Sequence, residues 1–153
     1  MKLTSILFVV SLFVASTTVI AKPIKTSEST IQKLKQFQLQ DHFLPDKFLY
    51  TGVQDPELKK QLNQKVADTS LAFIKLYESK TPPTRQQLLQ VLSEGINQID
   101  PASVDSEDRQ QVTTVFENFL DIIKLNSSEG ILNTWVYGEA INRMMEQGLI
   151  QPH

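Results

Sequence analysis

The stretch DPELKKQLNQKVADTSLAFIKLYES, residues 55–79, decides the fold class. Asp55 is a favourable N-cap residue, Pro56 is tolerated at the first helical position, and Glu57 complements the positive end of the helix dipole. This start signal and the apolar periodicity behind it predict a long amphipathic helix that ends near Ser79. Its apolar face consists of Leu58, Leu62, Val66, Phe73, Ile74 and Tyr77.

Three later stretches show the same helical periodicity, and each has its own start signal. These signals are a capping box at Thr84 and Gln87, a cap at Asp105 or Ser106, and a cap at Ser127 or Ser128. A shorter helix is expected from about Thr30, and Gly148 is expected to end the last helix. Two-residue alternation is absent, so the sequence predicts an all-α fold, a single irregular bundle of about five helices.

Residues 41–54 break this helical periodicity, with Pro45 and Gly52 as punctuation. The segment is rich in large apolar side chains, and we expect it to lie across the helical core as an ordered, aromatic-rich loop. Those side chains are Phe43, Leu44, Phe48, Leu49, Tyr50 and Val53.

The N-terminus has the layout of a bacterial secretory signal peptide. Lys2 supplies a positive charge, residues 6–14 form an apolar run, and Val19-Ile20-Ala21 resembles a small-residue cleavage site. The apolar stretch is shorter than the ~20 residues that span a bilayer and is interrupted by hydroxyl side chains, which makes an uncleaved anchor the weaker alternative. We therefore expect cleavage after Ala21 and a periplasmic or secreted protein without stable membrane insertion.

The remaining chain is long enough for one domain with a hydrophobic core. We expect a flexible N-terminus over residues 22–29 and a single helical domain over residues 30–150. Without Lys2 the chain has 14 Lys and Arg against 17 Asp and Glu, a formal charge of −3. Nucleic-acid binding relies on clustered basic residues, so this charge argues against a nucleic-acid partner. The lack of cysteine removes thiol nucleophiles, thiolate metal sites and thiol redox chemistry.

Candidate catalytic groups are few. His42 is followed by a Phe-Leu-Pro turn, and no Gly-x-Ser-x-Gly motif accompanies it, so we interpret it as a loop histidine at the surface or against Phe43. Glu117 and Asp121 would share one helix face, where a carboxylate pair could hydrolyse glycosides, but the solvated side of an amphipathic helix explains them better. No catalytic, cofactor-binding or metal site is predicted.

The densest charge feature is acidic and lies at the start of the helix expected after residue 104. Asp105, Glu107 and Asp108 lack the spacing of a calcium loop and are suited to stabilising a helix N-terminus. If the protein recognises a partner electrostatically, these three residues are the predicted contact.

Two stretches resemble an uncharacterised bacterial family of small exported helical domains of unknown function. They are residues 48–53 with Asp55-Pro56-Glu57-Leu58, and residues 125–133 leading into Trp135-Val136-Tyr137-Gly138. The resemblance spans about residues 40–148 and implies no activity. We interpret Trp135 and Tyr137 as core residues with hydrogen-bonding tips, and Gly52 and Gly138 as backbone-geometry positions.

The sequence thus favours a non-enzymatic periplasmic binding or inhibitor protein whose partner is another protein. An immunity protein against a periplasmic toxin is one such protein, by analogy rather than from residues. Two alternatives stay open: a cell-wall hydrolase that uses carboxylates such as Glu117 and Asp121, and an accessory subunit of an envelope complex.

Overall fold

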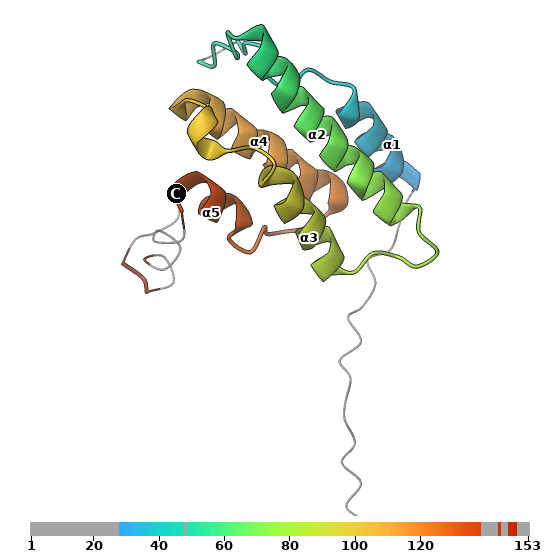
Figure 1. Ribbon diagram of the computed structural model, residues 1–153. Helices are drawn as coiled ribbons and strands as arrows, with labels where there is room; N and C mark the ends of the chain where they lie inside the picture. The colour runs from blue at the N-terminus through green and yellow to red at the C-terminus, as the bar shows by residue number, and fades with distance from the viewer. Residues whose placement is uncertain (1–27, 48, 139–143, 145–146, 150–153) are drawn as a thin grey trace, which may run out of the picture.

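The computed structural model describes residues 28–47, 49–138, 144 and 147–149, and the predicted signal peptide lies outside them. Five α-helices and a short 3-10 helix follow one another in this part of the chain (Figure 1). Since the described residues contain no β-strand, the predicted all-α class is confirmed. The helices are α1 Glu28–Gln38, α2 Pro56–Tyr77, α3 Arg85–Ile96, η1 Pro101–Ser103, α4 Ser106–Ile123 and α5 Ile131–Tyr137.

Three helices begin where local sequence signals predict. The Asp55 carboxylate accepts the backbone N–H groups of the next turn and caps α2. At α3, Thr84 and Gln87 form both halves of the capping box. Asp105 caps α4 by accepting the N–H of Asp108 at 2.8 Å. Each cap pairs a backbone donor that the helix itself leaves without a partner.

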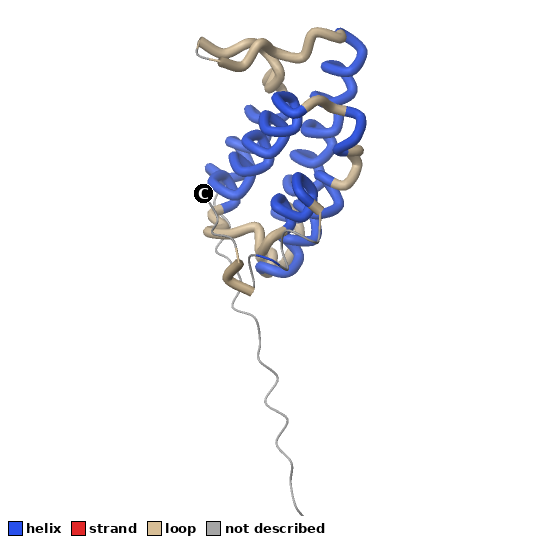
Figure 2. Tube along the Cα trace, turned by 90° about the vertical axis from the view of Figure 1, so that its left-hand side faces the viewer, coloured by secondary structure: helices blue, strands red, loops and turns tan. Residues whose placement is uncertain are grey.

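The helices pack around one core (Figures 1 and 2), in which α2 contacts α1 and α3, while α4 contacts α1, α3 and α5. Phenylalanines join α1, α2 and α4 at the centre. The Phe119 ring lies 4.8 Å from the Phe37 ring, 5.3 Å from the Phe73 ring and 5.5 Å from the Phe116 ring, measured between centroids. Such tilted and edge-on contacts favour aromatic pairs beyond the area they bury.

Helices α2 and α3 approach closely at Gly95, which is buried within α3. A Cβ atom at this position would lie 2.5 Å from the hydroxyl oxygen of Thr69 on α2. The Thr69 hydroxyl donates a hydrogen bond to the Lys65 carbonyl at 2.8 Å, which holds its side chain in place. The missing side chain therefore sets how near α2 and α3 can lie.

The two ends of the described region differ from expectation. Helix α1 begins at Glu28, two residues before the predicted start at Thr30 and inside the segment expected to be flexible. Helix α5 is capped by Gly130 rather than by Ser127 or Ser128, because the Ser127 hydroxyl instead accepts the N–H of Glu129 in the preceding turn. The prediction placed the serines correctly near the helix but assigned them the wrong role.

The end of α5 was also wrongly predicted. The helix stops at Tyr137 because Gly138 adopts a left-handed backbone conformation with φ of 79°. It is therefore the shortest of the five helices, not one of four long ones. Gly148 has φ of 69°, but most of the predicted continuation, residues 139–143 and 145–146, lies outside the described residues. No helix in the described ranges is long and apolar enough to cross a membrane.

Candidate functional site

Apart from Phe48, which lies outside the described residues, the segment between α1 and α2 forms the predicted ordered loop. Phe43 and Val53 insert into the core, and the Val53 N–H donates to the Phe43 carbonyl at 3.1 Å, which closes the base of the loop. Gly52 is required here: its φ is 76°, and a Cβ atom would lie 2.7 Å from the Pro45 nitrogen. The prediction that this segment packs on the core is therefore confirmed for its base.

The tip of the loop is held by one carboxylate. Asp46 accepts the backbone N–H groups of Leu49 and Tyr50, both at 2.9 Å, and its own N–H donates to the Tyr50 carbonyl at 3.0 Å. These bonds close the turn. In Figures 1 and 2 the described parts of the loop extend past the ends of the helices.

A single side-chain contact fastens this tip to α4. The Tyr50 hydroxyl donates to the Asp108 carboxylate at 2.7 Å, across 58 residues of sequence. Burial, followed by the hydrogen bond to Asp108, raises the pKa of Tyr50 above its usual value of 10.0, so Tyr50 stays neutral and remains the donor. The aromatic-rich loop and the acidic helix start, predicted as separate features, thus meet at one place.

The three residues of the predicted partner contact have different environments. Asp105 and Glu107 are exposed, and Asp105 caps α4. Asp108 is buried, with 7% of its surface exposed, and its carboxylate already binds Tyr50. Asp108 is therefore a structural anchor of the loop, and Glu107 is the carboxylate left to face solvent without a capping role.

A hollow of ≈ 400 Å³ separates the loop tip from the first turns of α4. Leu49, which lines the hollow, is 89% exposed, and Leu44 of the same loop is 52% exposed. Burying such aliphatic side chains against another molecule is favourable, because it removes apolar surface from water. We call the residues that line the hollow the loop–α4 surface: Asp46, Leu49, Tyr50, Ser106, Glu107, Gln110 and Gln111.

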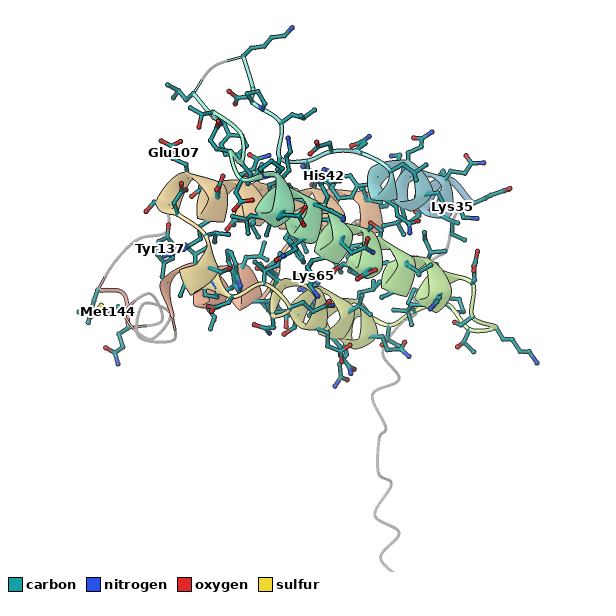
Figure 3. All side chains as sticks on the ribbon, turned by 45° about the horizontal axis from the view of Figure 1, so that its top comes forward. Lys35, His42, Lys65, Glu107, Tyr137 and Met144 are labelled. Atoms are coloured by element: carbon teal, nitrogen blue, oxygen red, sulfur yellow. The ribbon has the colours of Figure 1, made fainter. Side chains whose placement is uncertain are left out.

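His42 has a structural role at the base of the loop (Figure 3). Its Nε2 lies 2.8 Å from the Phe37 carbonyl, and its ring packs on Phe37 rather than on Phe43, with centroids 4.1 Å apart. Its backbone is bound as well, since its N–H donates to Asn63 and its carbonyl accepts from Gln111. Burial is the largest effect and lowers the pKa of His42 below 6.5. The Phe37 carbonyl and the Asp41 carboxylate have the opposite effect and raise this pKa.

The carboxylates considered for hydrolysis lie elsewhere. Glu117 and Asp121 are both exposed on α4, and they do not line the hollow at the loop–α4 surface or the three hollows described below. Among the described residues, no three His, Cys, Asp or Glu side chains are grouped closely enough to hold a metal ion. The exposure of both carboxylates matches the solvated side of an amphipathic helix, as the sequence predicted.

Two adjoining hollows, of ≈ 680 and ≈ 350 Å³, lie between α3 and α5. They share Glu129 and Ile131. An ion pair of 2.7 Å joins Arg85 Nε on α3 to the carboxylate of Glu129 in the turn before α5. Trp135 borders the second hollow, but its ring is core: it is 6% exposed, and its Nε1 donates to the Ile99 carbonyl at 2.7 Å. The core interpretation of Trp135 is thus confirmed, while that of Tyr137, which is 58% exposed, was wrong.

Comparison with known proteins finds similarity to domains of unknown function. Residues 25–140 match the model of a domain of unknown function, DUF4844. A crystal structure of a DUF3571 family protein from Acinetobacter baumannii AYE is 60% identical in sequence and superposes with a TM-score of 0.70. The match covers 76% of this chain and 94% of that one. No match was found among curated proteins. The resemblance noted from the sequence is confirmed, and this chain belongs to the DUF4844 family.

Proposed function

We propose that this is a non-enzymatic periplasmic binding or inhibitor protein that recognises another protein through the loop–α4 surface. The observation that carries the proposal is the exposure of Leu49 at the tip of a loop whose backbone is fixed by Asp46 and whose position is fixed by Tyr50. The predicted export supplies the compartment. An immunity protein against a periplasmic toxin is the form of this proposal to test first.

The chemistry of the surface defines the partner. Leu49 and Leu44 present aliphatic side chains, while Asp46 and Glu107 place carboxylates around the same hollow. A complementary surface has an apolar pocket for Leu49 and basic residues at its rim. Apolar anchors surrounded by a polar rim are the usual composition of protein interfaces, and complementary charge accelerates association.

The order of the loop also supports a binding role. A flexible loop would lose conformational entropy when it binds, whereas this loop is already held by Asp46, by Tyr50 and by the hydrogen bond between Gln111 and His42. Preorganisation of this kind reduces the free-energy cost of association. The surface is thus suited to a rigid docking contact.

The first experiment identifies the partner by photo-cross-linking from a chosen position on the loop–α4 surface. A photo-reactive amino acid replaces Leu49, and cells are irradiated before the envelope is fractionated. The matched control replaces Leu71, which is exposed on α2. Leu71 lies 15 residues along the helix from Pro56, or about 22 Å at 1.5 Å per residue. A defined adduct at Leu49 but not at Leu71 is expected, and equal labelling at both positions contradicts the proposed surface.

The second experiment measures association with the purified adduct partner. Glu107→Lys should lower the on-rate and weaken its salt dependence, because it removes an attractive charge from the rim. Glu117→Lys makes the same change at an exposed site on the same helix and should leave the on-rate unchanged. Equal effects of both variants would show that net charge, and not this surface, steers binding.

Compartment and activity are tested independently. The intact mass of protein from the periplasmic fraction should correspond to a chain that begins at Lys22, and full-length protein in the membrane fraction would favour the anchor instead. Hydrolysis of peptidoglycan by the pure protein, abolished by Glu117→Gln, would overturn the non-enzymatic proposal.

A further inference from the structure

Among the side-chain nitrogen and oxygen atoms of the described residues, one is buried without a hydrogen-bond partner: Nε of Arg109 on α4. The guanidinium makes a single long contact, from Nη2 to the Val104 carbonyl at 3.4 Å. A buried donor without an acceptor is unfavourable, and this is most severe when the donor carries charge. Arg109 as a whole is half-buried, so the structure leaves a partly exposed cation whose Nε–H lacks an acceptor.

The neighbouring carboxylates do not provide that acceptor. Asp105 lies one turn before Arg109, but its Oδ1 accepts the Asp108 N–H. Asp108 itself accepts the Tyr50 hydroxyl. Among the described residues, no Asp or Glu oxygen forms an ion pair with Arg109, whereas Arg85 has such a partner in Glu129. Arg109 thus differs from Arg85, whose guanidinium is paired with a carboxylate.

Arg109 lines a hollow between the first turns of α4 and the end of α5. The volume is ≈ 160 Å³, which is large enough for a small polar group. Ser106, Arg109 and Gln110 lie on one face of α4, three and four residues apart, and Val136 and Tyr137 form the opposite wall. In Figure 3, Tyr137 and Glu107 lie at the same end of the bundle, which places this hollow beside the loop–α4 surface.

We propose that this hollow binds a carboxylate group, with Arg109 as the principal ligand and Ser106 and Tyr137 as neutral hydroxyl donors. A carboxylate is the group that matches the planar guanidinium, because its two oxygens accept from two N–H groups at once. The apolar side chain of Val136 and the ring of Tyr137 leave room for a short aliphatic stem. The carboxylate comes from a small organic acid or from an acidic side chain of a bound protein.

This inference does not depend on the proposed function. The loop–α4 surface presents carboxylates and recognises basic groups, whereas the hollow at Arg109 recognises acidic ones. Ser106 and Gln110 line both hollows, so the two sites are adjacent and can be occupied by different groups. Failure at one site leaves the argument for the other unchanged.

The test follows the Arg109 Nε–H resonance by ¹⁵N NMR in the purified protein. Propionate is titrated at constant ionic strength, with propionamide as the uncharged isostere. Propionate should shift the Nε–H resonance downfield in a saturable manner, because the donor gains an acceptor, and propionamide should bind at least tenfold more weakly. A linear response that is equal for both compounds would overturn the proposal.

Matched variants locate the response. Arg109→Lys keeps the charge but has no Nε, and it should remove the propionate-dependent shift of the Tyr137 backbone amide. Arg85→Lys makes the same substitution at the paired arginine and should leave that shift intact. A shift that survives Arg109→Lys would overturn the assignment, and thermal unfolding of both variants verifies that they are folded.

A further arm separates the sources of the carboxylate. The blocked peptide acetyl-Gly-Glu-Gly-amide is compared with its Gln counterpart and with propionate. Tighter binding of the Glu peptide than of propionate assigns the site to a protein partner, and the reverse assigns it to a small acid. Glu139 follows shortly after Tyr137 in the sequence. If propionate bound only to the Glu139→Gln variant, the site would belong to a carboxylate of this chain and the proposal would fail.

Discussion

Replacing Gly95 by alanine has two opposing effects on the free energy of unfolding, and the sign of each is known. In the interior of an exposed helix, Gly→Ala is favourable by about 1 kcal/mol, because glycine loses more conformational freedom on folding. Gly95 is buried against α2, and a Cβ atom there would lie 2.5 Å from the Thr69 hydroxyl oxygen and 2.6 Å from its methyl carbon. Forcing extra volume into a packed contact costs about 1–3 kcal/mol.

The expected net result is a destabilisation of about 0.5–2 kcal/mol. The Thr69 side chain is 1% exposed and its hydroxyl bonds to the Lys65 carbonyl, so it cannot rotate away without losing that bond. Urea denaturation gives the free energy of unfolding directly. A thermal melt should show a decrease of roughly 4 °C per kcal/mol for a domain of this size.

The same substitution in a Thr69→Ala background tests whether the contact with Thr69 causes the destabilisation. Thr69→Ala removes both clashing atoms and leaves only the residue-69 Cβ atom, 3.1 Å from the new methyl. In that background Gly95→Ala should be neutral or stabilising, which gives a coupling energy of at least about 0.5 kcal/mol between the two positions. If Gly95→Ala stabilised the unmodified protein, or cost the same in both backgrounds, close packing of α2 on α3 would not explain this glycine.

Three further predictions concern buried polar contacts. Tyr50→Phe leaves the buried Asp108 carboxylate without its donor and should cost about 1–3 kcal/mol in urea denaturation at pH 7. Because the pKa of Tyr50 is raised in the folded state, the unfolded chain loses its proton first as pH rises. The free energy of unfolding should therefore fall above pH 10.0, and it should fall less in Tyr50→Phe. Parallel curves of unfolding free energy against pH for the two proteins would contradict this. The pKa of His42 is lowered, so the unfolded chain binds its proton first and stability should decrease as pH falls below 6.5, a loss that His42→Gln should reduce in denaturation measured down to about pH 5. Trp135→Ala should cost about 3–5 kcal/mol through lost packing and the lost bond to the Ile99 carbonyl, and a cost below about 1 kcal/mol would place Trp135 outside the core.

Helix starts were predictable because their signals are local. Asp55 bonds to residues two and three positions ahead, and Thr84 with Gln87 satisfies two donors within one turn. Such contacts depend little on the rest of the fold. At Ser127 the local signal was ambiguous, since a serine can cap a helix or close the turn before it, and Gly130 supplied the left-handed conformation that decided between them.

The candidate site was less predictable because its contacts join distant residues. Asp105, Glu107 and Asp108 have the same charge in the sequence, and only the approach of Tyr50 from 58 residues away distinguishes the buried carboxylate from the exposed ones. Arg109 carries no sequence signal at all. Its unpaired Nε results from how the neighbouring carboxylates are directed, with Asp105 toward the Asp108 N–H and Asp108 toward the Tyr50 hydroxyl, which is a property of the assembled fold.

The fastening of the loop to α4 has a consequence for folding kinetics. The contacts between α1 and α2 are close in sequence, whereas the bonds from Tyr50 to Asp108 and from Gln111 to His42 close segments of 58 and 69 residues. Long segments are entropically costly to close, so we expect these bonds to form after the transition state. Weakening them should then accelerate unfolding and leave the refolding rate nearly unchanged, as the two limbs of a chevron plot would show for Tyr50→Phe. These two hydrogen bonds would determine how long the native state persists rather than how quickly it is reached.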